Sequence, residues 1–184
     1  EFAHLLVSRH LRTGDHVVDA TVGNGHDTRF LAEAVGEGGR VDGFEIQPDA
    51  IRAARERLRD FPQVILHQVG HETMADRVPP ERAAVMFNLG YFPSGDKRII
   101  TRAETTLPAL DAALALLADG GLLTVVIYPG HPGGEEEARA VDAWFARLDS
   151  GPHRTLHCGP ATTSPRTASP YLLALEKREN TEQS

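Results

Sequence analysis

The sequence predicts a doubly wound, Rossmann-like α/β fold: a mostly parallel seven-stranded sheet that ends in a C-terminal antiparallel hairpin. Short, β-branched apolar runs alternate with longer amphipathic stretches, which is typical of strand-helix-strand units. A chain of 184 residues can bury one substantial core but is too short for two ordinary domains. No helix-like stretch separates the last two strand-like runs, so they should pair as a hairpin rather than in parallel.

The first half of the chain alternates strands and helices around glycine and proline signals. Gly14 follows the first helical pattern, and glycine readily takes the left-handed conformation that ends a helix. Pro48 stands at a position where helices often begin. We predict helices over 3–12, 27–35 and 48–61 and strands over 16–20, 40–46 and 64–68.

The second half continues this alternation after a polar loop. Residues 122–128 are hydrophobic without a break, which indicates a strand buried on both faces. Asp119-Gly120-Gly121 should end the long helix before it. We predict strands over 83–88, 122–128, 153–158 and 171–176, helices over 105–117 and 135–148, a loop over 159–170, one domain over 1–178 and a frayed tail over 179–184.

Composition excludes several classes of protein. Hydrophobic residues make up 41% and charged residues 24%, the balance of a folded chain, and no apolar run approaches the roughly 20 residues that span a bilayer. The lone Cys158 cannot close an internal disulfide, which favours a cytoplasmic protein. The net charge of −7 argues against wide, sequence-independent binding of nucleic acid. The nine histidines lack the spacing of a metal site, so we predict none.

The turn after the first strand is the strongest candidate ligand site. In doubly wound folds, ligands bind beyond the carboxyl ends of the strands. The segment Asp19-Ala20-Thr21-Val22-Gly23-Asn24-Gly25-His26-Asp27-Thr28 lies there, and its glycines let a ligand approach the backbone at a helix start. Glu45 ends the next strand, about 20 residues on, where a carboxylate can accept hydrogen bonds from the ribose hydroxyls of an adenosine moiety.

The same loop discriminates between adenosine cofactors. Dinucleotide sites require Gly-x-Gly-x-x-Gly, but Thr28 stands where the third glycine would be. Asp19 would repel a pyrophosphate, whereas it could hold the ammonium group of an amino-acid cofactor. The sequence lacks Gly-Lys-Ser/Thr, so it has no P-loop. The pattern therefore favours S-adenosylmethionine, with S-adenosylhomocysteine as the product.

The motifs taken together resemble a known family. The glycine segment is similar to the class I methyltransferase pattern Asp/Glu-x-Gly-x-Gly-x-Gly, with Thr21 where the first glycine is usual. Together with Asn88-Leu89-Gly90-Tyr91, Gly95-Asp96-Lys97 and Tyr128-Pro129-Gly130-His131-Pro132-Gly133-Gly134, it resembles the family described as "Putative rRNA methylase", also called YtqB-like or MnmM, from about residue 4 to residue 177. The resemblance implies methylation of a transfer RNA wobble uridine, from 5-aminomethyl-2-thiouridine to 5-methylaminomethyl-2-thiouridine.

Asn88-Leu89-Gly90-Tyr91 occupies the place where amino-group methyltransferases carry Asp/Asn-Pro-Pro-Tyr. An amide oxygen can accept a hydrogen bond from an amine, and an aromatic ring can stack on a base. Methyl transfer to nitrogen needs positioning and no covalent nucleophile, so Cys158 is not required. An alkylammonium must first lose a proton, for which Asp96 and His131 are candidate acceptors. The predicted catalytic residues are Asn88, Tyr91, Asp96 and His131.

Further residues complete the predicted site. His71-Glu72 follows the third strand, where this fold usually places a side chain beside adenine, whereas Glu135-Glu136-Glu137 should simply complement a helix dipole. The predicted cofactor-binding residues are Asp19, Gly23, Asn24, Gly25, Asp27, Thr28, Glu45, Ile46, Gln47, His71, Glu72, Asn88 and Gly90. The predicted substrate-binding residues are Tyr91, Lys97, Thr105, Tyr128, Gly133 and Gly134.

Other functions stay open on the residues alone. They are methylation of ribosomal RNA or of a small-molecule amine, an NAD-dependent oxidoreductase, and a nucleotide-binding module without catalysis. The acidic charge suits a small amine better than RNA, and only the family resemblance favours transfer RNA. The chain offers no separate RNA-binding domain, so the catalytic face itself would have to bind the RNA, in one arrangement across a homodimer.

Overall fold

The computed structural model describes residues 2–90, 100–149, 151–159 and 169–178. Its strands are β1 (His16–Asp19), β2 (Arg40–Phe44), β3 (Val64–His67), β4 (Arg82–Leu89), β5 (Leu117–Ile127), β6 (Arg154–Cys158) and β7 (Tyr171–Glu176). They form a seven-stranded sheet in the order β3-β2-β1-β4-β5-β7-β6. β1 to β5 pair in parallel, and β7 runs antiparallel to both β5 and β6. The predicted fold class and its antiparallel hairpin are therefore confirmed.

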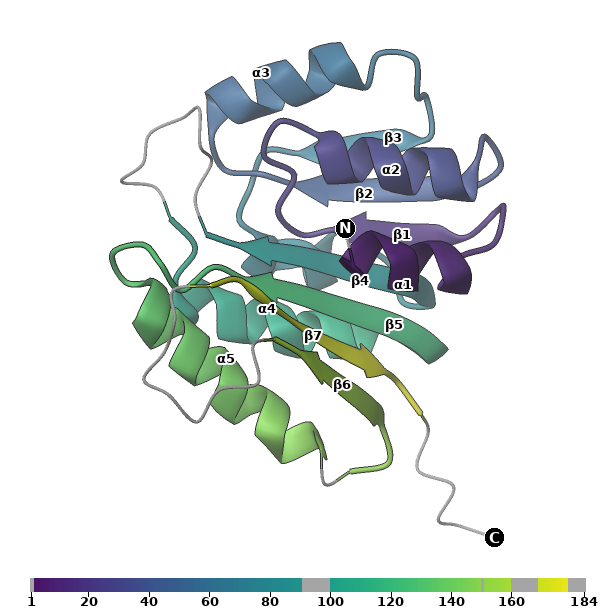
Figure 1. The fold of residues 1–184 in the computed structure, drawn as a ribbon. Coiled ribbons are helices and arrows are strands. Elements are labelled where there is room, and N and C mark those ends of the chain that lie inside the picture. Colours follow the sequence, from purple (N-terminus) through teal and green to yellow (C-terminus); the bar gives the residue numbers. More distant parts are fainter. Residues whose placement is uncertain (1, 91–99, 150, 160–168, 179–184) are drawn as a thin grey trace, which may run out of the picture.

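Helices cover both faces of this sheet. They are α1 (Phe2–His10), α2 (His26–Val35), α3 (Pro48–Arg57), α4 (Ala103–Leu116), α5 (Gly134–Asp149) and the 3₁₀ helix η1 (His71–Asp76). α1, α2 and α3 lie on one face, and α4, α5 and η1 lie on the other (Figure 1). None of the described helices is both long enough and apolar enough to cross a membrane.

The core has two layers because successive residues of a strand point to opposite faces of the sheet. Val17 of β1 packs with Val7 of α1 and Leu31 of α2, whereas its neighbour Val18 packs with Leu110 of α4 on the other side. Both valines are fully buried. The central strands are therefore hydrophobic on both faces, which is why they read as unbroken apolar runs in the sequence.

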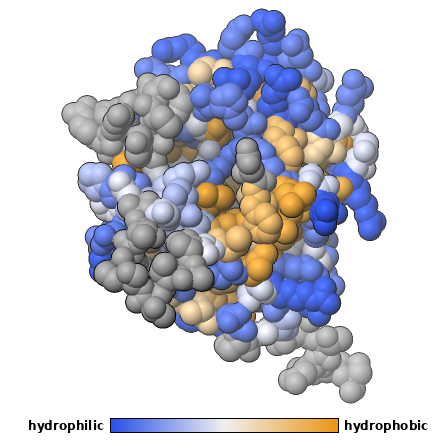
Figure 2. All heavy atoms as spheres, viewed as in Figure 1, coloured by the Kyte–Doolittle hydropathy of each residue, from blue (hydrophilic) through white to orange (hydrophobic). Residues whose placement is uncertain are grey.

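α1 leaves part of its own face uncovered. In the view of Figure 2, hydrophilic residues surround a group of hydrophobic residues near the middle of the molecule. Phe2 and Leu5 of α1 are each 45% exposed on this side of the sheet. These two side chains therefore leave apolar surface on α1.

Two element boundaries differ from the sequence prediction by more than two residues, and one short helix was not predicted. α3 ends at Arg57, four residues early, in a turn that buries Leu58. β5 begins at Leu117, because its first residues pair with β4 before a register shift, and the turn at Gly120 bonds to the backbone of Lys177. The stretch predicted as a polar loop contains η1, which forms because Met74 is fully buried against the α4 layer.

Candidate active site

A cleft of about 650 Å³ opens at the carboxyl ends of the parallel strands. This volume is typical of sites that enclose a small molecule or cofactor. Each of five strands contributes to its lining through the residues at its end or just beyond it. They are residues 20–24 after β1, 45–47 after β2, 69–72 after β3, 88–90 at the end of β4 and Tyr128 after β5, joined by His26, Asp27, Phe44, Ile100, Thr101 and Thr105.

The glycine loop between β1 and α2 needs glycine for two different reasons. Gly23 and Gly25 have φ angles of 53° and 83°, in the left-handed region that side chains disfavour. In addition, a Cβ at Gly25 would lie 3.2 Å from both Cα and Cβ of Ala54 on α3. Gly23 and Asn24 line the cleft, whereas Gly25 forms the contact between the loop and α3.

Glu45 ties the end of β2 to the glycine loop. Its Oε2 accepts a hydrogen bond from the backbone N–H of Gly23 at 2.9 Å, and its Oε1 accepts one from Gln47 at 2.8 Å. Both oxygens belong to a residue that lines the cleft, and each carboxylate oxygen has room for a second donor. Ile46, half exposed beside it, adds an apolar wall. The arrangement fits a ligand that brings two adjacent hydroxyls and a flat apolar ring.

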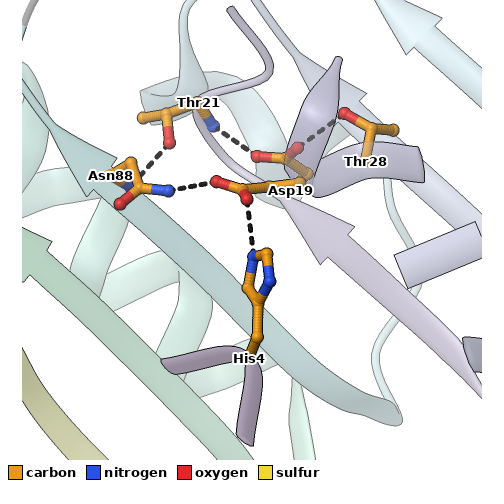
Figure 3. Close-up of polar contacts among 6 residues, drawn as sticks. His4, Asp19, Thr21, Thr28 and Asn88 are labelled. Carbon is orange, nitrogen blue, oxygen red and sulfur yellow. Dashed lines mark hydrogen bonds and ion pairs between the residues drawn. The ribbon is translucent and has the colours of Figure 1, made fainter. Parts of the chain in front are cut away.

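Asp19 lies beneath the loop rather than in the cleft. It is only 1% exposed, and its carboxylate accepts hydrogen bonds from Oγ1 of Thr28 at 2.6 Å and from the backbone N–H of Thr21 at 3.0 Å (Figure 3). Burial, with a smaller effect of nearby Asp27, raises the pKa of Asp19 to about 7. Asp19 and Thr28 were predicted to touch the cofactor, but their observed contacts stay inside the protein and hold the loop in shape.

A chain of side chains joins α1 to the end of β4 at the mouth of the cleft. Asp27 Oδ1 lies 2.6 Å from Nε2 of His4, and Asp27 Oδ2 accepts a hydrogen bond from Nδ2 of Asn88. The backbone N–H of Asn88 donates to Oγ1 of Thr21 at 2.7 Å (Figure 3). Sequence reasoning missed His4, because no motif marks it and only the fold brings α1 to this position.

His71 and Glu72 close the cleft on the side of β3. His71 is 8% exposed, and its Nδ1 donates to the backbone carbonyl of Ala20 at 3.2 Å. Burial lowers the pKa of His71, so the ring is neutral at pH 7. Across the described ranges, no group of three or more His, Cys, Asp or Glu side chains is arranged to hold a metal ion.

A buried carboxylate supports the wall of the cleft at the end of β4, and its burial was not predicted from the sequence. Glu137 was expected only to complement the dipole of its helix, but it is also 2% exposed, and burial raises its pKa. Its Oε2 accepts a hydrogen bond from Oγ1 of Thr101 at 2.7 Å, and its Oε1 accepts one from Oγ1 of Thr106 at 2.6 Å. The signal was present, since Glu137 shares the buried face of α5 with Val141 and Trp144 at helical spacing.

Thr101 connects Glu137 to the end of β4 through hydrogen bonds. Its Oγ1 accepts a hydrogen bond from the backbone N–H of Gly90 at 2.8 Å, and its own backbone N–H donates to the carbonyl of Gly90 at the same distance. Glu137 on α5 and Thr106 on α4 therefore fix the strand end that carries Asn88. Thr105, predicted to bind substrate, lines the cleft beside Thr101.

Only part of the segment after β5 lines the cleft. Tyr128 is 45% exposed and lines the cleft, and partial burial together with nearby Asp27 raises its pKa. The described lining does not include His131, Gly133 or Gly134. Gly134 begins α5, where a Cβ would lie 2.9 Å from Nε2 of His131. Tyr91, Asp96 and Lys97, also predicted at the site, lie outside the described residues.

Comparisons with known proteins agree with this geometry. The chain is 39% identical, over 98% of its own length and 69% of the relative's, to the Arabidopsis thaliana protein "tRNA (mnm(5)s(2)U34)-methyltransferase, chloroplastic". The crystal structure of a Clostridium thermocellum protein described as "putative rRNA-methylase" superposes with a TM-score of 0.89 at 42% identity, over 95% of each chain. A Streptococcus mutans protein described as "a putative methyltransferase", solved in complex with SAH, superposes with a TM-score of 0.84 at 32% identity, again over 95% of each chain.

The model of one protein family covers most of the structure just described. That family carries the description "Putative rRNA methylase", and its model matches residues 41–176, from β2 to the end of β7. The matched region includes Glu45, Asn88 and Glu137. On the family model and on these relatives, the chain belongs to the "Putative rRNA methylase" family.

Proposed function

We propose that this protein is an S-adenosylmethionine-dependent N-methyltransferase of transfer RNA. Its product would be 5-methylaminomethyl-2-thiouridine at the wobble position, made from the 5-aminomethyl nucleotide. One observation carries the proposal: a single cleft joins a glycine loop with its paired carboxylate, Glu45, to the amide side chain of Asn88. The Arabidopsis relative, whose printed name states this transfer RNA nucleotide, supports the choice of substrate.

The cofactor half of the cleft supports an adenosyl ligand. The two oxygens of Glu45 offer acceptor positions for the ribose hydroxyls, and Ile46 with the neutral His71 offers surfaces for the adenine ring. Gly23 and Asn24 let the amino-acid portion approach the backbone. S-adenosylmethionine supplies an electrophilic methyl group on a sulfonium, and the relative from Streptococcus mutans was solved with SAH.

The substrate half supports an amine attached to a base. Oδ1 of Asn88 can accept a hydrogen bond from the amine and turn its lone pair towards the methyl group. Tyr128, half exposed at the end of β5, can stack on the uracil ring. The roles proposed for Tyr91, Asp96, Lys97 and His131, with the last as a candidate proton acceptor, stay predictions. A cytoplasmic location and a homodimer also stay predictions, and the Arabidopsis relative is chloroplastic.

The test is methylation of defined transfer RNA. Purified protein, S-adenosylmethionine and transfer RNA bearing 5-aminomethyl-2-thiouridine are incubated, and the digested nucleosides are analysed by mass spectrometry. We expect conversion to the methylaminomethyl nucleoside by the wild type and its loss in Asn88→Ala, which should still bind the cofactor in calorimetry. If the transfer RNA stays unmodified while ribosomal RNA or a free amine is methylated, the proposed substrate is wrong.

A further inference from the structure

We propose that His4 and Asp27 are positioning residues that hold the carboxamide of Asn88 in the one orientation that presents its oxygen to the substrate amine. The three side chains come from α1, the start of α2 and the end of β4. That the group facing Oδ1 of Asn88 is a substrate amine rests on the proposed function. The orientation itself rests only on the hydrogen bonds of the protein.

Asp27 decides which way the carboxamide of Asn88 faces. An ionised carboxylate only accepts hydrogen bonds, so it can face Nδ2 of Asn88 but not Oδ1. The bond from Nδ2 to Asp27 Oδ2 therefore turns Oδ1 away from Asp27. The backbone of Asn88 is fixed as well, through its N–H bond of 2.7 Å to Thr21. Both Asn88 and Asp27 line the cleft, so the carboxamide is held where a ligand can reach it.

His4 holds Asp27 in turn. Its Nε2 donates to Asp27 Oδ1 at 2.6 Å, and a hydrogen bond to a carboxylate is stronger than one between two neutral groups. The ring of His4 stacks on Phe30 of α2, with centroids 4.0 Å apart and planes only 4° from parallel. The side chains of His4 and Asp27 are 38% and 22% exposed, so solvent reaches only part of each. The ring stack of His4 and the two hydrogen bonds of Asp27 limit the rotation of both side chains.

The orientation matters because the two ends of a carboxamide have opposite hydrogen-bonding roles. With Oδ1 towards the amine, Asn88 accepts an amine N–H and leaves the nitrogen lone pair free for the methyl group. With Nδ2 there, the amide would donate to that lone pair and compete with transfer. Small errors in reactant placement cost up to about 100-fold in rate, so the loss of orientation should lower kcat more than cofactor affinity.

Substitutions can separate positioning from binding. Asp27→Asn places a group beside Asn88 that can face either end of its carboxamide. His4→Phe keeps the stack on Phe30 but loses the donor, whereas His4→Gln keeps a donor nitrogen. His10→Phe is the matched control, because His10 lies on the same helix and, among the described residues, its ring bonds to the backbone carbonyl of Ala83 at 3.2 Å.

We expect Asp27→Asn to lower kcat for transfer RNA methylation about 100-fold and His4→Phe about 10-fold, with cofactor Kd within about threefold of wild type in both. His4→Gln should keep most of the kcat that His4→Phe loses, and His10→Phe should have the kcat of the wild type. If kcat is unchanged in Asp27→Asn, the positioning role is refuted. If cofactor affinity falls in parallel with kcat, Asp27 is a cofactor ligand instead and the proposal is overturned.

A spectroscopic measurement tests the geometry without any activity. The side-chain NH₂ resonances of Asn88 in a ¹⁵N–¹H correlation spectrum, assigned by their absence in Asn88→Ala, should shift in Asp27→Asn and in His4→Phe but not in His10→Phe. Unmoved resonances in Asp27→Asn would overturn the proposed contact. If the wild type leaves aminomethyl transfer RNA unmodified, the proposed function is refuted. The spectrum would still show whether Asp27 orients the carboxamide of Asn88.

Discussion

Asp19 links the stability of the glycine loop to pH. Burial raises its pKa to about 7 from 3.8, so over that interval the folded protein binds a proton that the unfolded chain has released. The contribution of Asp19 to stability is therefore fully present below the pKa of the unfolded chain, 3.8. It is lost as the pH rises through the pKa of the folded protein, about 7. The loop that supports the cofactor site thus carries a buried group that titrates near neutral pH.

The prediction is a difference between two unfolding curves. Between pH 5 and pH 8 the wild type should lose roughly 2 to 3 kcal/mol more unfolding free energy than Asp19→Asn, because the variant has no titrating group at this position. Urea unfolding at both pH values measures it, and the titrations of His71 and Glu137 are common to both proteins and cancel. Parallel pH dependence of the two proteins would show that Asp19 titrates normally.

Gly25 tests why the loop needs glycine. Gly25→Ala meets an unfavourable φ and also brings a Cβ to 3.2 Å from Ala54, so the loop must move off α3. Gly14→Ala is the control, since Gly14 also has a positive φ, of 94°, but a Cβ there meets nothing within 4 Å. Both variants should lose about 1 to 2 kcal/mol of stability from the backbone strain. Cofactor affinity in calorimetry should fall at least about 10-fold in Gly25→Ala only, because a small misplacement of binding groups is costly; equal affinities would contradict this account.

Single residues were predictable where their position in the chain defines their role. Gly23 follows β1, Glu45 follows β2 and Asn88 lies near the end of β4. Local sequence is enough to place all three at one edge of the sheet. His4 was not predictable, because its contact with Asp27 depends on how α1 packs against the sheet. The burial of Asp19 was missed because a strand-end carboxylate can point up to a ligand or down under its own loop.

At the scale of elements, Glu137 joins α5, α4 and the end of β4. Glu137→Ala would leave the fully buried hydroxyl of Thr106 without its acceptor and would open a cavity at the start of α5. The expected loss is about 3 kcal/mol of unfolding free energy, measured by urea denaturation. Glu136→Ala on the same turn is exposed and should change stability by less than about 0.5 kcal/mol. Equal effects of the two variants would show that Glu137 does not connect these elements.

The order of strands and helices could be predicted, but several of their ends could not. Apolar runs such as 122–128 mark buried strands because hydrophobicity decides which segments enter the core. The start of β5 at Leu117 depends on pairing with Arg82 and on the backbone of Lys177, both distant in sequence. η1 has only Met74 to mark its buried side, too little for a periodic signal.

At the scale of the whole molecule, the two halves of the sheet form different parts of the cleft. On the proposed function, the ends of β1, β2 and β3 would form the cofactor wall, and the ends of β4 and β5 would form the substrate wall. Asp27 stands between the two walls, bonded to Asn88 on one side and to His4 of α1 on the other. Because the net charge is −7, we expect contacts around the substrate wall, rather than a broad basic surface, to select the RNA of the proposed function.

The most direct test of this account is a crystal structure of the protein with S-adenosylhomocysteine. We predict that both ribose hydroxyls bond to Glu45, that the adenine lies between Ile46 and His71, and that the sulfur points towards Asn88. A ligand bound away from the glycine loop, or one that makes no contact with Glu45, would contradict the account.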